Sequence, residues 1–153
     1  MSTRVYKVVF DKSSHDLNED YEKLSDYEKE KISDLDADSF FDYHDYKDSY
    51  VCYIITTPTE FKIYSSILIK NLIYHEPTDI SKNILSFKTD LSEELRPLLS
   101  STNSIKYSFF MDDLKDWIYK NLDIDGVLDR ITEVGLNNLS SIEKEFLKNF
   151  HLP

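Results

Sequence analysis

The chain has 153 residues, of which 41% are hydrophobic and 14% aromatic, and this is enough apolar material for one compact domain. It carries 29 acidic and 18 basic residues, a formal net charge of −11. This excess of acid argues against nucleic acid and anionic membranes as partners, because both attract clustered cations. A protein with a basic surface, a metal cation or a small molecule remains open as a partner.

The longest apolar stretch, at residues 63–74, is interrupted by polar side chains and is shorter than the roughly 18 to 20 apolar residues of a membrane span. The first residues soon acquire charges, so they lack the continuous apolar core of a signal peptide. A single cysteine, Cys52, allows no internal disulfide and is typical of a reducing compartment. We therefore expect a cytoplasmic protein that has no membrane partner.

Glycine and alanine are scarce, with two Gly and one Ala, whereas Lys, Asn, Ile, Tyr and Asp are abundant. This bias follows AT-rich codons and indicates a low-GC bacterium or one of its phages. It also has a physical consequence, because phosphate-binding loops need glycines that let the backbone approach the ligand closely. A Rossmann fingerprint and a P-loop are both excluded, and no cofactor is expected.

The first half of the chain alternates strand and helix patterns. Residues 4–10 are β-branched and aromatic on both faces, which predicts a strand with Val5, Lys7 and Val9 on one side and Tyr6, Val8 and Phe10 on the other. Residues 17–35 have a thin apolar stripe and predict one surface helix. Residues 34–50 lack a helical stripe and indicate an acidic aromatic loop. Residues 50–56 again have a strand pattern.

A β-α-β unit is predicted over residues 50–75. Thr57 is a suitable cap for a helix whose first residue is Pro58, where the missing N–H does no harm. The expected helix extends to Leu72, and the short run 73–75 would form the third strand before Pro77. The apolar face of the helix comprises Phe61, Tyr64, Leu68 and Leu72.

The second half of the chain is mainly helical in pattern. Asp79 is a suitable cap for a short helix, and Asp112 with Asp113 is expected near the start of a later one. The later helix has an apolar face formed by Phe110, Leu114, Trp117 and Ile118. The tail predicts a helical hairpin that turns at Gly135, with Val127 and Leu128 on the apolar face of its first arm. A capping box at Ser140 and Glu143 is expected to start the second arm.

These patterns together predict an α+β fold in a single domain, residues 1–153. We expect a small sheet of about three strands, including the β-α-β unit, covered by helices and followed by a mainly helical C-terminal half.

The last 30 or so residues also carry a resemblance. The runs Val127–Gly135 and Leu139–Leu147 resemble a helical-hairpin segment at the C-termini of assorted Bacteroidota proteins, including some rhomboid-family membrane proteases. The resemblance implies the hairpin and a source among these bacteria. It does not imply rhomboid activity, because the chain has neither the membrane helices nor the Gly-x-Ser motif of those proteases.

Two acidic motifs resemble known functional motifs, one of a phosphatase and one of a calcium-binding loop. The run Asp123–Asp129 begins with the Asp-x-Asp-Gly of haloacid-dehalogenase-type phosphatases, but a helix pattern precedes it and too little chain follows, so we expect Asp123 to be a helix cap. A weak calcium site is the second candidate, because Asp34, Asp36, Asp38 and Asp45 overlay the ligand spacing of an EF-hand loop. Ser39 replaces the glycine of that loop and Asp45 the final glutamate, so a solvated acidic loop without metal is the preferred interpretation.

The four histidines, His15, His44, His75 and His151, form no zinc-ligand spacing with one another or with Cys52. Ser, His and Asp are all plentiful, so the sequence alone neither supports nor excludes a catalytic triad. No catalytic residue is assigned.

Charge placement is the strongest functional signal. Residues 16–48 contain 13 acids and four lysines, a net charge of −9, and aromatic side chains are interspersed among the acids in the second half of this segment. Aromatic side chains supply much of the contact energy at protein interfaces, and surrounding charges speed the encounter with an oppositely charged partner. The predicted partner-binding residues are Asp38, Phe41, Asp42, Tyr43, Asp45, Tyr46 and Asp48.

The favoured function is therefore non-enzymatic binding to a protein with a basic surface, as in inhibitors, immunity proteins and nucleic-acid mimics. Two alternatives remain open. One is an oligomeric structural or accessory component of a phage, which would show large apolar surfaces. The other is a small enzyme or a weak calcium-binding protein, and a deep pocket with converging polar groups would be the mark of an enzyme.

Overall fold

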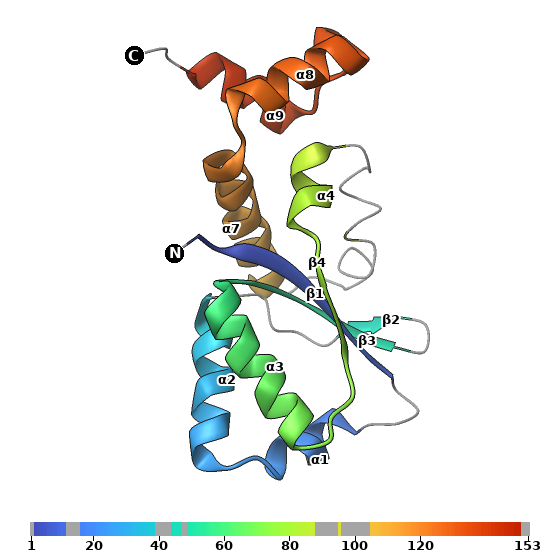
Figure 1. The fold of residues 1–153 in the computed structure, drawn as a ribbon, viewed down its shortest axis with the longest axis vertical. Helices are drawn as coiled ribbons and strands as arrows, with labels where there is room; N and C mark the ends of the chain where they lie inside the picture. Colours follow the sequence, from blue (N-terminus) through green and yellow to red (C-terminus); the bar gives the residue numbers. More distant parts are fainter. Residues whose placement is uncertain are drawn as a thin grey trace.

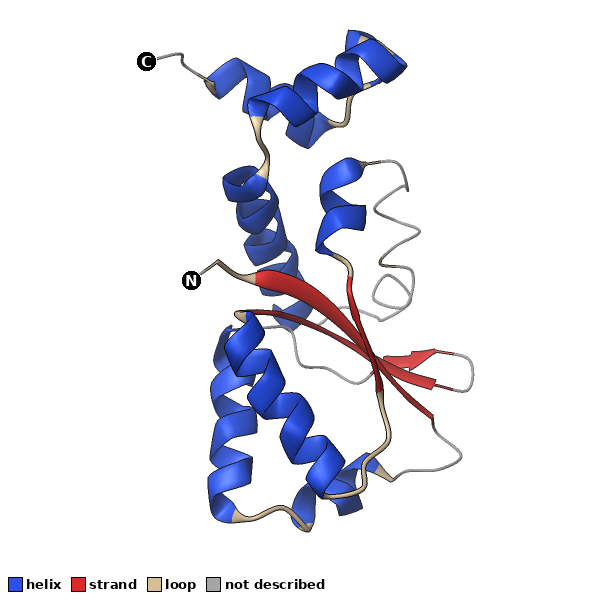
Figure 2. Cartoon of the chain, viewed as in Figure 1, coloured by secondary structure: helices blue, strands red, loops and turns tan. Residues whose placement is uncertain are grey.

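The computed structural model describes residues 2–11, 16–38, 44–46, 49–87, 95 and 105–150 of the chain. Helices cover both faces of a four-stranded antiparallel sheet, and a pair of helices follows at the C-terminal end (Figures 1 and 2). The predicted α+β class is confirmed.

The sheet has the strand order β2-β3-β1-β4, with β1 at Arg4–Asp11, β2 at His44–Tyr46, β3 at Ser49–Thr56 and β4 at Glu76–Asp79. The central pair β1 and β3 is in register from Arg4 opposite Thr56 to Asp11 opposite Ser49. Because β1 lies between β3 and β4, the segment that joins those two strands crosses over β1 (Figure 1).

Side chains alternate between the two faces of the central strands, as the period of two requires. Val5 of β1 lies on one face with Val51, Tyr53 and Ile55 of β3. The opposite face is formed by Tyr6, Val8 and Phe10 of β1 with Cys52 and Ile54 of β3. Both faces are buried under helices, which explains why these strands are apolar at almost every position.

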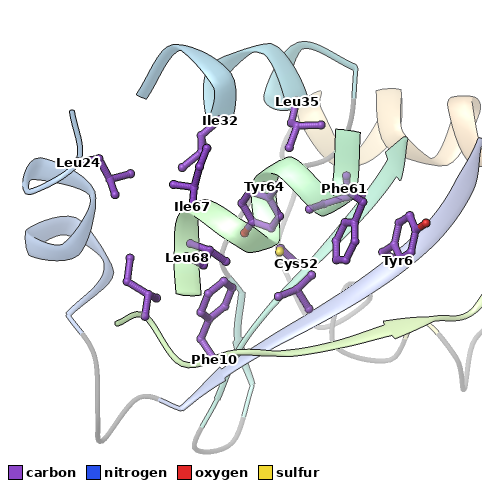
Figure 3. Close-up of a cluster of buried hydrophobic side chains, with 13 residues drawn as sticks. Tyr6, Phe10, Leu24, Ile32, Leu35, Cys52, Phe61, Tyr64, Ile67 and Leu68 are labelled. Carbon is purple, nitrogen blue, oxygen red and sulfur yellow. The ribbon is translucent and has the colours of Figure 1, made fainter. Parts of the chain in front are cut away.

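Helix α1 at Leu17–Glu22 is followed by two helices that cover the second face, α2 at Asp26–Asp38 and α3 at Pro58–Lys70. Figure 3 shows their apolar side chains converging on that face of the sheet. Phe61 of α3 stacks on Tyr6 of β1, with ring centroids 3.9 Å apart and planes 7° apart. Thr57 caps α3 as predicted, since its hydroxyl accepts from the Glu60 N–H at 3.2 Å.

The first face is covered by α4 at Ser81–Ser86 and α7 at Ile105–Asn121. The four predicted apolar positions of α7, from Phe110 to Ile118, are all buried there. The indole N–H of Trp117 donates to the Thr3 carbonyl oxygen at 3.1 Å and so ties α7 to the start of the chain.

The C-terminal hairpin consists of α8 at Ile124–Val134, a short 3₁₀ turn at Leu136–Asn138 and α9 at Ser141–Asn149. Asp123 caps α8 and Ser140 begins α9 with a capping box, as predicted. Gly135 ends α8 at a φ of +86°, a conformation that favours glycine. Within the described part of the chain, no helix combines the length and the apolar character needed to cross a bilayer.

The structure corrects several local predictions in the first half of the chain. Residues 17–35 form two helices, because Ser25 and Glu28 make a capping box that starts α2. The third strand lies at Glu76–Asp79 instead of 73–75, and Pro77 is tolerated because β4 is at the edge of the sheet. The expected loop at 34–50 is wrong in part, since residues 34–38 complete α2 and residues 44–46 form β2.

Four side chains do not lie where the sequence pattern placed them. Leu72 has an exposed fraction of 87%, because the chain reverses at the end of α3 before this residue reaches the sheet. Leu128, expected on the apolar face of α8, is exposed as well. Asp112 and Asp113 lie inside α7, which begins at Ile105, several residues earlier than predicted.

Candidate functional site

The predicted partner-binding residues fall partly within the described chain. Asp38 is the last residue of α2, and Asp45 and Tyr46 belong to β2 at the edge of the sheet. Asp45 lies opposite Tyr50 and Tyr46 opposite Ser49 in the hairpin formed with β3. The remaining predicted residues, Phe41, Asp42, Tyr43 and Asp48, lie outside the described residues.

The first part of the candidate calcium-binding loop is helical in the structure. Asp34, Asp36 and Asp38 lie in α2 and Asp45 lies in β2, so the first three of the four positions belong to a helix, whereas an EF-hand supplies its ligands from a loop. Among the described residues, no group of three or more His, Cys, Asp or Glu side chains is placed to hold a metal ion.

The acidic part of the sequence is organised as a helix pair. We define the acidic helix pair as residues 16–38, which include α1 and α2 and carry ten acidic residues and three lysines, a net charge of −7. Leu24, Ile32 and Leu35 are buried against α3 and the sheet (Figure 3). The outer side therefore presents the charge, with these acidic side chains exposed: Asp16, Glu19, Glu22, Asp26, Glu30 and Asp34.

Two tyrosines accompany the exposed acids. Tyr27 has an exposed fraction of 63%, and Tyr21 is also exposed. Lys29 lies over the Tyr21 ring at 5.5 Å from its centroid and is 3.6 Å from a Glu22 carboxylate oxygen, and Lys31 lies 5.6 Å from the Tyr27 centroid. Two of the three lysines are thus already engaged within the acidic helix pair.

One acidic side chain of this pair is buried and has a structural role. Glu28 closes the capping box with Ser25, accepts from the Asn71 side-chain amide at 3.0 Å and lies 3.6 Å from the Lys70 ammonium. The Ser25 backbone N–H first of all, with the Asn71 amide, lowers the pKa of Glu28 from its ordinary value of 4.5 to about 2. Glu28 therefore fastens the start of α2 to the end of α3.

A pocket of about 470 Å³ lies at the same end of α3, where the chain turns towards β4. Its lining is mostly apolar and comes from one segment of the chain, and it comprises Ser65, Ile69, Leu72, Ile73, Tyr74, His75 and Pro77. Sequence analysis did not predict this pocket, because its shape depends on the turn after α3 and on the place of β4 in the sheet.

Ser65 and His75 form the polar wall of this pocket. Ser65 Oγ is 2.8 Å from His75 Nε2, and His75 Nδ1 is 3.1 Å from the Ile73 carbonyl oxygen. A carbonyl oxygen only accepts, so Nδ1 carries the hydrogen, and in the neutral ring Nε2 accepts from the Ser65 hydroxyl. No motif signals this pair, since Ser65 lies in α3 and His75 lies ten positions later, in the connection that precedes β4.

A hydroxyl bonded to an imidazole is the arrangement that activates serine nucleophiles. Acyl transfer also needs hydrogen-bond donors aimed at the developing oxyanion. Ser65 lies in the interior of α3, where the backbone N–H groups bond within the helix, so these amides do not supply such donors. The pair is therefore suited to holding a polar group at the pocket wall.

Cys52 offers no reactive thiol, because it is fully buried in the cluster beneath α3 and burial raises its pKa. The thiolate, which is the nucleophilic form, is strongly disfavoured there. Comparison of the chain with protein-family models, with curated proteins and with solved structures gives no match.

Proposed function

We propose that this chain is a non-enzymatic binding protein that uses the acidic helix pair to bind a protein with a basic surface. Inhibitors, immunity proteins and nucleic-acid mimics act in this way, and a cytoplasmic location belongs to the same proposal. The support is the position of the acids along the two helices, together with the exposed tyrosines among them.

The observation that carries the proposal is the end of α2. Asp34, Asp36 and Asp38 all fall in its last five residues, and neither α1 nor α2 has a basic residue in its last turn. The C-terminus of a helix carries partial negative charge, so acids there oppose the helix dipole and lower local stability. Acidic residues that only keep the protein soluble could lie anywhere on its surface. Acids that bind a partner must lie on the binding surface, even where they oppose the helix dipole.

The exposed tyrosines give the surface a source of contact energy. Tyr27 and Tyr21 are exposed on the same helix pair as the acids. Tyrosines of this kind are typical anchors at protein interfaces, where a surrounding rim of charge orients the partner. The sequence-predicted residues Asp45 and Tyr46 of β2, with Phe41, Asp42, Tyr43 and Asp48, stay part of the proposed partner-binding set.

The proposal is tested by stopped-flow association with protamine, an arginine-rich peptide, as the labelled probe. In the test variant, Glu19→Gln, Glu30→Gln and Asp34→Asn remove three exposed charges from the acidic helix pair. At low ionic strength we expect the association rate to fall on the order of tenfold, with a shallower dependence on salt.

The matched control removes three exposed acids from the C-terminal hairpin, by Asp129→Asn, Glu133→Gln and Glu145→Gln. Both variants change the net charge by the same amount, so the control should retain most of the wild-type rate. Equal losses in the two variants would show that binding follows total charge and would refute the proposed surface. A further variant, Asp42→Asn with Asp45→Asn and Asp48→Asn, tests the predicted extension in the same assay.

A further inference from the structure

The end of α3 is a Schellman motif that carries leucine where glycine is usual. The Ile73 N–H donates to the Leu68 carbonyl oxygen at 2.9 Å, and the Leu72 N–H donates to the Ile69 carbonyl oxygen at 3.1 Å. Leu72 occupies the left-handed position with a φ of +60°. For a residue with a Cβ this conformation is unfavourable, and glycine or asparagine commonly takes the position.

Comparison with Phe87, the other non-glycine residue with a positive φ in the described part of the chain, shows what is unusual at Leu72. Phe87, with a φ of +51°, also follows a helix, but it packs against the cluster on the first face of the sheet. Its burial offsets the backbone strain. Leu72 has an exposed fraction of 87%, so neither its backbone nor its side chain is stabilised by packing. Such unfavourable features cluster at binding sites.

Leu72 lies at the rim of the 470 Å³ pocket together with the exposed Ile69 and Tyr74. This volume is within the 300 to 1,000 Å³ range of small-molecule sites. The lining amounts to seven residues, whereas a stable protein interface uses about 20 to 30 residues and about 800 Å² on each side. The size of the pocket therefore favours a small molecule over a protein partner or a second copy of the chain.

The polar wall narrows the chemistry of the ligand. When the His75 ring is neutral, its Nε2 accepts a hydrogen bond from the Ser65 hydroxyl, and the lone pairs of Ser65 Oγ are left to accept one from a ligand. We propose that the pocket between α3 and β4 binds a small apolar molecule that carries a hydroxyl group, with the hydroxyl donating to Ser65 Oγ and the apolar body under Leu72, Ile69 and Tyr74. This site is independent of the acidic helix pair.

The test uses 1-naphthol and naphthalene as probes, because they share a ring system and differ in the hydroxyl. Titrations monitored by probe fluorescence and by calorimetry should show saturable binding of 1-naphthol to the wild-type protein, about five- to tenfold tighter than that of naphthalene. Ser65→Ala should remove this difference by weakening 1-naphthol alone. Equal affinity of the wild-type protein for both probes, or no saturable binding below 1 mM, would overturn the proposal.

The variant Leu72→Gly tests whether the Leu72 side chain contributes to ligand binding without contributing to the stability of the fold. Glycine fits the left-handed position, so the variant should keep the thermal stability of the wild type while both probes bind at least fivefold more weakly. Leu72→Asn gives a second variant compatible with the backbone. Leu136→Gly, at an exposed leucine remote in sequence from the pocket lining, is the control and should leave probe binding unchanged.

Self-association of the wild-type chain through the pocket rim is the result that would contradict a small-molecule site. If sedimentation shows a dimer that Leu72→Gly dissociates, the rim is a contact between copies and the small-molecule proposal is wrong. A monomer at all concentrations, with probe binding that responds to Ser65 and Leu72 as described, supports it.

Discussion

The same local motif occurs in two helix pairs, α2 with α3 and α8 with α9. In each pair a serine and a glutamate three residues later form a capping box, Ser25 with Glu28 and Ser140 with Glu143. Each glutamate then reaches the neighbouring helix. Glu28 accepts from the Asn71 amide at 3.0 Å, and Glu143 accepts from Arg130 Nε at 3.3 Å.

The two pairs differ in what supports them. α2 and α3 lie on the sheet over a cluster of thirteen buried side chains (Figure 3). α8 and α9 enclose a cluster in which three residues are buried, Val127, Leu139 and Phe146. The comparison teaches that a capping box fixes where a helix begins, whereas the apolar surface that the helix buries determines how stable it is.

Removing the chain after Gly135 gives the largest expected effect. The truncation deletes α9, uncovers Val127 and removes Ile142 from the cluster between α7 and the sheet. We expect loss of the sharp thermal transition and of the near-UV signal of Trp117, because the hairpin and α7 share apolar contacts. A cooperative transition with an unchanged Trp117 signal would make the hairpin a separate unit and contradict the single-domain prediction.

Two phenylalanines of almost equal burial compare the pairs directly. Phe61 stacks on Tyr6 within the large cluster, whereas Phe146 meets Tyr119 and Phe150 at centroid distances of 5.7 and 5.8 Å. Substitution by alanine should lower the unfolding free energy by about 4 to 5 kcal/mol at Phe61 and by about 3 kcal/mol at Phe146, since the small cluster can collapse more easily around the gap. Urea unfolding of both variants measures the difference, and a larger loss at Phe146 would reverse the comparison.

Acid titration of stability should report on Glu28. Its pKa is about 2 in the folded chain, below its ordinary value of 4.5, so Glu28 stabilises the fold above pH 4.5. This contribution is lost as the pH falls from 4.5 through 2. Urea unfolding at a series of pH values should show a weaker pH dependence in Glu28→Gln than in the wild type over this window. Identical slopes for the two proteins would contradict the role given to Glu28.

The smallest expected effect is a change in the unfolding free energy when acidic residues at the ends of α2 are neutralised. α9 has Lys148 in its last turn, in accord with the helix dipole, whereas α2 ends in acids. Asp34→Asn with Asp38→Asn should stabilise the free protein by about 0.5 to 1 kcal/mol at low salt, and Asp26→Asn in the first turn of α2 should have the opposite sign. Thermal unfolding at low and high salt measures both variants. Destabilisation by the first change would show that these acids have partners within the fold.

Local signals in the sequence were sufficient for much of the fold. The patterns of residues 4–10 and 50–56 predicted the two central strands, with the two faces of the first, and Thr57 with Pro58 marked the start of α3. Ser140 with Glu143 marked the start of α9. The same Ser-x-x-Glu signal occurs at Ser25, but a thin apolar stripe continues through it, and this stripe taken alone predicts one helix.

The features that only the tertiary structure decided depend on contacts between distant parts of the chain. The path by which the chain returns to the edge of the sheet after α3 decides three features. It sets the place of β4, leaves Leu72 exposed and brings Ser65 to His75. Alternation, helical period and capping act over a few neighbouring residues, so the sequence by itself determined the central strands, the starts of α3, α8 and α9, and the location of the acidic charge. The pocket required the packing of α3 and β4 against β1, which no short pattern encodes.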